Sequence, residues 1–225
     1  MFRKYEKTFR IPTPNTTILT KQCLSKIDVQ RLLTGLVTIE EKIDGANVGI
    51  IGGKGSKEFR LQKRGSLVDV SEHPQFGRFK AWSIEHYENL MKIKWPTIIF
   101  GEFMWATHHI YYDELPDWFI CFDIWTGNEF LNRKHKVEVC SELGLQVIPC
   151  LFENYVSSTL ELEVFLENKS FYSSSELCEG VVVKNYRKQL KGKLVRPSFI
   201  KEIDEDGSNW RRHWNSNKVN RLKMV

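Results

Sequence analysis

The chain has 225 residues, of which 41% are hydrophobic and 27% charged, and its formal net charge is +5. This composition is ordinary for a soluble globular protein, and the length allows one large domain or one domain with a small appendage. No stretch approaches the ~20 consecutive apolar residues of a membrane-spanning helix, and the N-terminus lacks the apolar segment of a signal peptide.

The predicted elements are mostly strands. Strands are expected at 36–41 and 46–51, then a glycine-rich loop at 52–56 and a strand at 59–63. A helix follows at 83–94 and ends before Pro96, and two apolar strands follow at 97–103 and 118–125. A helix at 128–143, capped by Asn128, then precedes a strand at 145–151, a helix at 157–168 and short strands at 181–183 and 193–196. Many strands with few helices, not in strict alternation, predict an α+β fold built on antiparallel sheets.

The turn between the first two strands carries the most informative residue, Lys42. Residues 38–47 read Thr-Ile-Glu-Glu-Lys-Ile-Asp-Gly-Ala-Asn, so a lysine ends an apolar strand and Asp-Gly follows two residues later. An amine in this place suggests a nucleophile for covalent chemistry. The alternative is an ordinary turn, since most Asp-Gly pairs form hairpins and such short motifs recur by chance.

Three carboxylates also occur in or beside apolar strands. Glu102 lies within Phe-Gly-Glu-Phe, Asp123 within Phe-Asp-Ile, and Glu179 directly before Gly-Val-Val-Val-Lys. A buried carboxylate needs a cationic partner or a bound ligand. Each of the three could equally pair with a lysine for structural reasons alone.

Six motifs in this order resemble those of the covalent nucleotidyltransferases, and more narrowly the ATP-dependent RNA ligases of the RNA ligase 2 type. They are Glu-Lys-Ile-Asp-Gly from residue 41, Gln-Lys-Arg-Gly from 62, Phe-Gly-Glu-Phe from 100, Phe-Asp-Ile from 122, Glu-Gly-Val-Val-Val-Lys from 179 and Lys-x-Lys from 191. The resemblance runs from about Tyr5 to Phe199. It implies an α+β nucleotidyltransferase domain, ATP-grasp-like, with antiparallel sheets flanked by helices.

The resemblance implies an enzyme that forms lysyl-AMP, passes AMP to an RNA 5′-phosphate and seals that end to a 3′-hydroxyl. Lys42 would attack the α-phosphorus of ATP, and Lys184 and Lys193 would be catalytic cations that hold the phosphates. A lysine with an ordinary pKa near ~10.4 must first lose its proton, through desolvation, neighbouring cations or a metal ion. Glu102 and Glu179 would face the ribose and bind Mg²⁺ or Mn²⁺.

The other residues that the resemblance implies bind the nucleotide. Phe122 would stack on the adenine, with Glu41 at its polar edge. Arg64 would contact phosphate or ribose, and Asn47 would orient the nucleotide or the RNA terminus. The nucleotide-binding set, which also includes residues named above, is Glu41, Asp44, Gly45, Asn47, Arg64, Glu102, Phe122, Glu179, Lys184, Lys191 and Lys193.

The chain departs from the family pattern at two places. Counted back from Phe199, the last motif aligns Lys193 with the first expected lysine and Val195 with the second, so Lys193 is favoured over Lys191. Only about 25 residues follow Phe199, where these ligases usually carry a further domain. We expect either a catalytic fragment or a minimal enzyme, with a domain at 1–206 and a tail at 207–225.

The tail contains five basic residues and no acid, which accounts for the whole excess of +5. Interleaved with Trp210, His213 and Trp214, these residues could bind nucleic acid, or the tryptophans could cover an apolar patch. A second cluster, His108 and His109, could suggest a metal site, but adjacent residues of a strand point in different directions. A loop contact to phosphate or solvent is therefore favoured for the two histidines.

Two other functions remain open: a related nucleotidyltransferase, either a DNA ligase or a GTP-using capping enzyme, and a non-catalytic nucleic-acid-binding module. Expected partners are ATP and RNA ends or a nicked RNA duplex, with no membrane, and the protein is expected to be a monomer. Its five scattered cysteines lack a Cys-x-x-Cys pair. They argue against disulfides and zinc and favour the cytoplasm.

Overall fold

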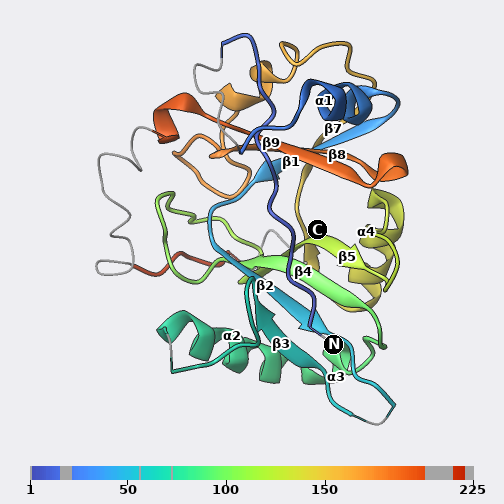
Figure 1. Ribbon diagram of the computed structural model, residues 1–225. Helices are drawn as coiled ribbons and strands as arrows, with labels where there is room; N and C mark the ends of the chain where they lie inside the picture. The colour runs from blue at the N-terminus through green and yellow to red at the C-terminus, as the bar shows by residue number, and fades with distance from the viewer. Residues whose placement is uncertain (1, 16–21, 56, 72, 201–214, 221–225) are drawn as a thin grey trace.

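Two sheets form the frame of the protein. The computed structural model describes residues 2–15, 22–55, 57–71, 73–200 and 215–220. A four-stranded sheet has the order β7-β1-β8-β9 and a five-stranded sheet the order β3-β2-β4-β5-β6, one above the other in Figure 1. Their ladders are antiparallel except for the parallel pair β5–β6. The predicted α+β class with antiparallel sheets is confirmed.

The strands follow the apolar runs of the sequence closely. They are β1 Val37–Lys42, β2 Ala46–Ile51, β3 Arg60–Lys63, β4 Ile98–Phe103, β5 Phe119–Trp125, β6 Gln146–Val147, β7 Cys150–Asn154, β8 Gly180–Asn185 and β9 Leu190–Val195. The helices are α1 Lys26–Leu33, α2 Pro74–Glu85, α3 Tyr87–Leu90 and α4 Arg133–Glu142, and the 3-10 helices are η1 Glu163–Glu167 and η2 Tyr186–Lys188. None of the helices in the described ranges combines the length and the hydropathy needed to cross a membrane.

The helices differ from the sequence predictions. The one predicted at 83–94 is replaced by α2 and α3, because His73 caps an earlier start by accepting the Gln75 N–H. α4 begins five residues later than predicted, because the side chain of Asn132, not Asn128, accepts the His135 N–H as the N-cap. The helix predicted at 157–168 was wrong, since only η1 forms there. α1 was not predicted, and its one fully buried side chain, Leu32, gives little helical periodicity.

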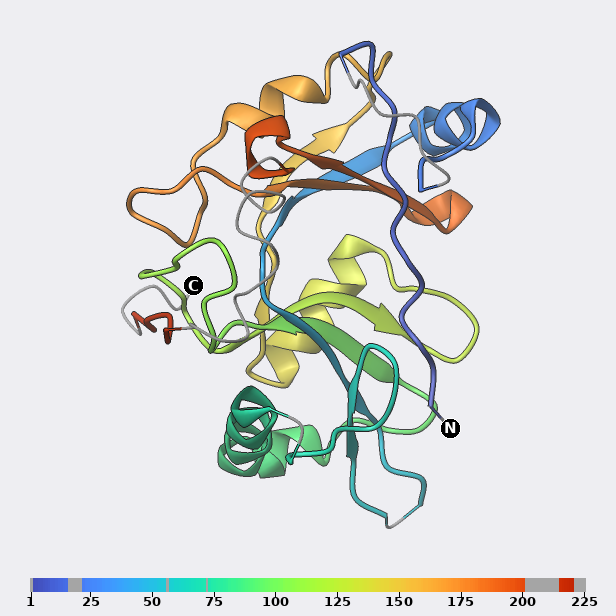
Figure 2. The same cartoon turned by 60° about the vertical axis from the view of Figure 1, so that its left-hand side comes forward.

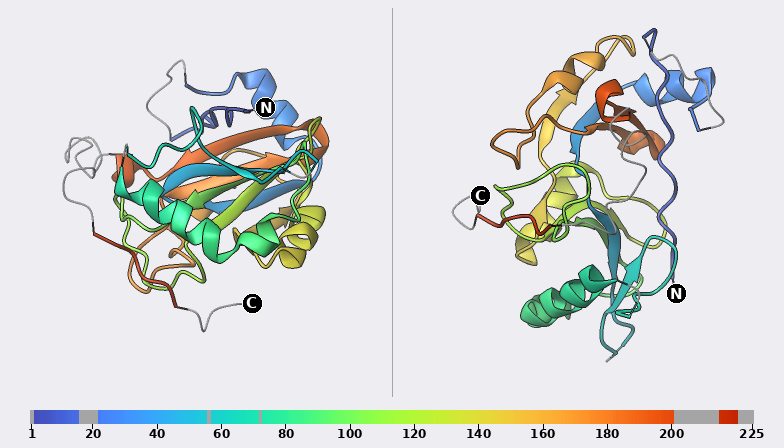
Figure 3. Two further views of the ribbon diagram at one scale, coloured as in Figure 1. Left: turned by 90° about the horizontal axis from the view of Figure 1, so that it is seen from below. Right: turned by 90° about the vertical axis from the view of Figure 1, so that its left-hand side faces the viewer.

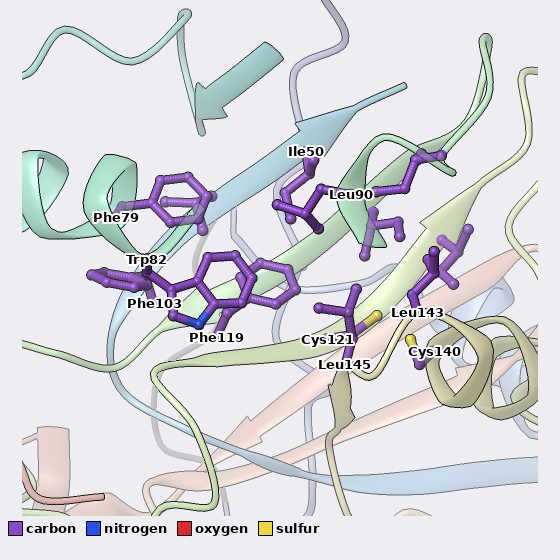
Figure 4. Packing of buried hydrophobic residues seen from close by; sticks show 14 of the residues in the cluster. Ile50, Phe79, Trp82, Leu90, Phe103, Phe119, Cys121, Cys140, Leu143 and Leu145 are labelled. Carbon is purple, nitrogen blue, oxygen red and sulfur yellow. The ribbon is translucent and has the colours of Figure 1, made fainter. Parts of the chain in front are cut away.

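Each sheet buries its outer face under helices. α2 and α4 cover the five-stranded sheet, where Phe79 and Trp82 of α2 pack with Phe103 and Phe119 (Figure 4). α1 and η1 cover the four-stranded sheet through a second apolar cluster that contains Leu32 and Leu166. Figure 3 shows this arrangement from two further sides. The two inner faces are thereby left to face each other.

Two extended segments pack on this frame. Residues 2–11 run across both sheets, as Figures 1 and 2 show, and the Ile11 N–H donates to the Lys193 carbonyl at 2.8 Å. Residues 215–220 lie beside the loop between β4 and β5, where the Asn217 N–H donates to the Trp105 carbonyl at 2.9 Å. This part of the predicted tail therefore packs on the domain. Trp210, His213 and Trp214 lie outside the described residues.

Candidate active site

The link between β1 and β2 places Lys42 where the two sheets meet. β1 and β2 belong to different sheets, so residues 43–45 cross between the sheets and do not close a hairpin. Gly45 allows a close approach here, because a Cβ on it would lie 2.7 Å from Met104 Sδ and 2.9 Å from Glu102 Cγ. Lys42, the last residue of β1, therefore lies beside the end of β4.

A cavity of about 190 Å³ opens between the inner faces of the sheets. Eight of the predicted site residues line it: Glu41, Lys42, Asn47, Arg64, Glu102, Phe122, Lys184 and Lys193. The remaining wall comes from the N-terminal segment, through Tyr5, Glu6, Lys7 and Thr8, and from Glu40, Ile43, Ile148 and Val182. The fold thus gathers side chains from motifs up to about 150 positions apart around one space.

Lys42 forms an ion pair inside this site. Its Nζ lies 2.5 Å from Glu179 Oε2, and its side chain is 23% exposed. Burial alone would lower the pKa of Lys42, but three nearby carboxylates outweigh burial and hold the pKa above its ordinary value. They belong, in order of strength, to Glu179, Asp44 and Glu102. In this arrangement the carboxylates favour the protonated amine, so the loss of its proton through desolvation, cations or a metal ion stays a prediction.

The two predicted metal-binding carboxylates flank Lys42. Glu179 directly precedes Gly180, which pairs with Lys42 across β8 and β1, and Glu102 pairs with Asn47 across β4 and β2. Burial, with the charges of Asp44 and Glu179, raises the pKa of Glu102 to about 8. Burial also raises the pKa of Glu179, although the Lys42 charge opposes it. Burial therefore favours the protonated forms of both carboxyl groups.

Asp44 is held from the side of the β4–β5 loop. Its Oδ2 accepts the His109 N–H at 2.9 Å and lies 3.1 Å from His109 Nδ1, while its own N–H donates to the Tyr112 hydroxyl at 2.8 Å. Burial would raise the pKa of Asp44, but the His109 hydrogen bond and the Lys42 charge hold it below its ordinary value. His108 Nδ1 lies 3.8 Å from Asp44 Oδ1. Both histidines thus contact a carboxylate, not solvent.

Lys184 belongs to a buried ion network below the cavity. Its Nζ lies 2.7 Å from Glu40 Oε2 and from Asp123 Oδ1, and it donates to the Phe122 carbonyl at 2.6 Å. Burial disfavours its charge, but the two carboxylates raise its pKa well above the ordinary value. The charge of Lys184 is thus balanced mainly by Glu40 and Asp123.

The two lysines of the last motif occupy different places. Lys193 pairs with Val182, which is opposite Glu40, whereas Lys191 pairs with Lys184. Lys193 therefore lies two residue pairs nearer to Lys42 along the sheet than Lys191 does. Burial, followed by the Lys42 charge, lowers the pKa of Lys193 to about 8. Lys191 Nζ instead lies 3.6 Å above the Tyr5 ring and 3.4 Å from Asp123 Oδ2.

Four further predicted residues differ in what they offer the cavity. Phe122 lines it and packs edge-on against Tyr5, with ring centroids 5.0 Å apart. Asn47 Oδ1 is buried and has no hydrogen-bond partner among the described residues, while Arg64 is exposed at the rim. The Glu41 carboxylate accepts the Ser170 hydroxyl at 2.6 Å and the Phe171 N–H at 2.8 Å. Glu41 thus lines the cavity while its carboxylate holds the loop at Ser170 and Phe171.

The carboxylates suit a divalent cation. Glu102 and Glu179 offer carboxylate oxygens on either side of Lys42, and such hard oxygen ligands fit Mg²⁺ or Mn²⁺. Within the described residues, no group of three or more His, Cys, Asp or Glu side chains forms a complete metal site. Glu102 and Glu179 would therefore supply only part of the ligands, and water and substrate phosphates the rest.

The sequence did not predict the residues that hold the cavity wall and the β4–β5 loop in place. Lys136 of α4 donates to Glu40 Oε1 at 2.5 Å and to the Phe122 carbonyl at 2.8 Å. Asn217 holds the loop that carries His109. One indication of this network was present in the sequence: Glu40 lies in the middle of an apolar strand, and a buried carboxylate requires a cationic partner.

Known proteins share this fold. A family model described as RNA ligase matches residues 35–199. Among solved structures, the chain is similar to a Naegleria gruberi RNA ligase mutant with ATP and Mn, with a TM-score of 0.63 and 13% identity over 89% of this chain and 58% of that one. The same ligase with PPi gives a TM-score of 0.63 and 13% identity over 91% and 58% of the two chains. A sequence comparison with curated proteins found no match.

At this identity the solved structures establish the shared fold, and the chain spans 58% of the length of these ligases. The family match is broader than any single motif, because it covers most of the chain and contains Lys42, Glu102, Glu179 and Lys193. The chain belongs to the RNA ligase family.

Proposed function

We propose that the protein is an ATP-dependent RNA ligase of the RNA ligase 2 type that works through a lysyl-AMP intermediate. The observation that carries this proposal is the position of Lys42. Its amine is at the floor of the inter-sheet cavity, 2.5 Å from Glu179, and Glu102 and Lys193 act on it electrostatically. An amine held beside carboxylates in a cleft of this family fits covalent nucleotide transfer.

The cavity offers a place for adenosine and for a triphosphate. Phe122 and Val182 line it from opposite sheets, so a flat base can lie between two apolar surfaces. Lys193 and Arg64 supply positive charge for the phosphates. The unpartnered Asn47 Oδ1 can accept a hydrogen bond from a ribose hydroxyl. Divalent metal at Glu102 and Glu179 would neutralise phosphate charge and polarise the α-phosphate.

Lys42 must lose a proton before it can react. Glu179, whose pKa burial raises, is hydrogen-bonded to Nζ and can accept that proton. When ligands neutralise the carboxylates, the interactions that raise the Lys42 pKa weaken, and the Lys193 charge then favours the free amine. Nζ forms a bond to the α-phosphorus, the bond from that phosphorus to the bridging oxygen breaks, and pyrophosphate leaves.

Two further transfers complete the proposed reaction. An oxygen of the RNA 5′-phosphate attacks the α-phosphorus, the N–P bond breaks, and Lys42 regains a proton. The RNA 3′-hydroxyl then attacks the activated 5′-phosphate, loses its proton and expels AMP. Lys193 and Arg64 are placed to hold the phosphates through both transfers.

Sealing of a nicked duplex with a labelled 5′-phosphate tests the proposal. We expect sealed RNA with ATP and Mg²⁺ or Mn²⁺, none from Lys42→Met, and normal sealing from Lys80→Met, an exposed lysine of α2. Sealing that persists in Lys42→Met would contradict the assigned nucleophile. Preference for GTP or for a DNA nick would contradict the assigned nucleotide or polymer.

A further inference from the structure

Asn217 is buried in a segment whose neighbours are exposed. It is 2% exposed, whereas Asn215, Ser216 and Lys218 lie at the surface. Its Nδ2 donates to the carbonyls of Met104 at 2.7 Å and of Ala106 at 3.4 Å. Its Oδ1 accepts from the Thr107 hydroxyl at 2.8 Å and from the Tyr112 N–H at 3.0 Å. Both ends of the amide are thus bonded to the β4–β5 loop.

The backbone around Asn217 reinforces the same contact. The Thr107 N–H donates to the Asn215 carbonyl at 2.8 Å, and the Lys218 N–H donates to the Tyr112 carbonyl at 2.8 Å. Residues 104–118 contain no strand or helix, so their buried backbone groups need partners from elsewhere. Residues 215–220 supply several of these partners, from a segment about 100 positions away in the sequence.

The loop that Asn217 holds is also the one that fixes Asp44. Tyr112 donates its N–H to Asn217, and its hydroxyl accepts the Asp44 N–H. His109, between Thr107 and Tyr112, binds the Asp44 carboxylate through its N–H. Asp44 is two residues from Lys42, and its charge contributes to the Lys42 pKa. Hydrogen bonds through the β4–β5 loop therefore join Asn217 to Asp44, in the link that follows Lys42.

We infer that Asn217 is a positioning residue for the reaction of Lys42: it fixes the β4–β5 loop so that Tyr112 and His109 hold Asp44, and thereby the Lys42 turn, in reactive geometry. The inference rests on the proposed function. It assigns to the C-terminal segment 215–220 a part in the first chemical step, the formation of lysyl-AMP. Asn217 contacts neither nucleotide nor RNA in this role.

The test is the rate of lysyl-AMP formation with labelled ATP, measured at saturating and limiting ATP. Since small displacements of reacting groups slow a reaction strongly, Asn217→Ala should react about 10- to 100-fold more slowly at saturating ATP, with little change in KM. Asn215→Ala, an exposed neighbour, should match the wild type. Tyr112→Phe should also be slow, and adding it to Asn217→Ala should slow the reaction little further, because both act through one path.

Asn217→Asp provides a second readout that a purely structural role would not give. At high pH its carboxylate faces the Met104 and Ala106 carbonyls and cannot donate, so the reaction should be slow. At low pH the protonated acid can donate again, and the ratio of its rate to the wild-type rate should rise. This variant also serves if Asn217→Ala does not fold.

Wild-type labelling together with an unchanged rate in Asn217→Ala would overturn the inference alone. The inference would also be overturned if the double variant slowed the reaction by the product of the two single effects of Asn217→Ala and Tyr112→Phe. It would be overturned as well if the rate of Asn217→Asp relative to the wild-type rate did not change with pH. Absence of labelling in the wild type would instead refute the proposed function, and this inference with it.

Discussion

Replacing Glu40 by Gln should destabilise the fold more than replacing Lys136 by Met, although the two side chains share one ion pair. Glu40, 1% exposed, meets Lys136 at 2.5 Å, Lys184 at 2.7 Å and Arg133 at 3.1 Å. Glu40→Gln leaves Lys136 buried without an ion-pair partner, and breaking a buried pair in this way costs about 3–5 kcal/mol. Lys136→Met leaves Glu40 with two cations and loses hydrogen bonds worth about 1–3 kcal/mol.

Urea unfolding of the nucleotide-free protein measures both effects. With a slope of about 1–3 kcal/mol/M, Glu40→Gln should lower the midpoint by about 1 M or more. Lys134→Met, an exposed lysine of the same helix, should stay within about 0.5 kcal/mol of the wild type. The reasoning is refuted if Lys136→Met is as destabilising as Glu40→Gln, or if Glu40→Gln behaves like the control.

Three further predictions follow from the site. The pKa of Glu102 is raised from 4.5 to about 8 in the folded protein, so the folded state binds the extra proton and stability falls as pH rises from about 4.5 to 8. Glu102→Gln should therefore raise Tm more at pH 8.5 than at pH 6, and an equal effect at both pH values would contradict this. Gly180→Ala should lower the urea midpoint of unfolding, because the new Cβ would lie 2.1 Å from a β9 carbonyl oxygen. Gly77→Ala in α2, whose Cβ meets nothing within 4 Å, should instead raise the free energy of unfolding by up to about 1 kcal/mol. Equal midpoints for the two variants would show that the clash at Gly180 is relieved. Lys193→Met should slow lysyl-AMP formation more than Lys191→Met does, and the reverse order would show that Lys191 holds the phosphates.

The sequence allowed the strands and the nucleophile to be predicted for physical reasons. Buried strands require apolar runs, so β4 and β5 are visible in the sequence, and Lys42 is marked by the Asp-Gly that lets the chain cross between sheets. Helix starts were less predictable, because Asn128 and Asn132 have equal capping chemistry and only the surrounding structure selects Asn132.

The supporting contacts could not be predicted. Glu40 and Lys136 are 96 positions apart, and Asn217 is more than 100 positions from the loop it holds. A single polar residue has no periodicity that indicates its partner. The direction of the Lys42 pKa shift could not be predicted for a related reason: it is the balance of burial and three carboxylates, which depends on distances that the sequence does not contain.

The most direct measurement of the central claim is the intact mass of the protein after incubation with ATP and Mg²⁺. The account predicts a gain of one AMP, located on Lys42 by peptide mapping and removed by added pyrophosphate. An unchanged mass in the wild type, or the same adduct in Lys42→Met, would contradict it.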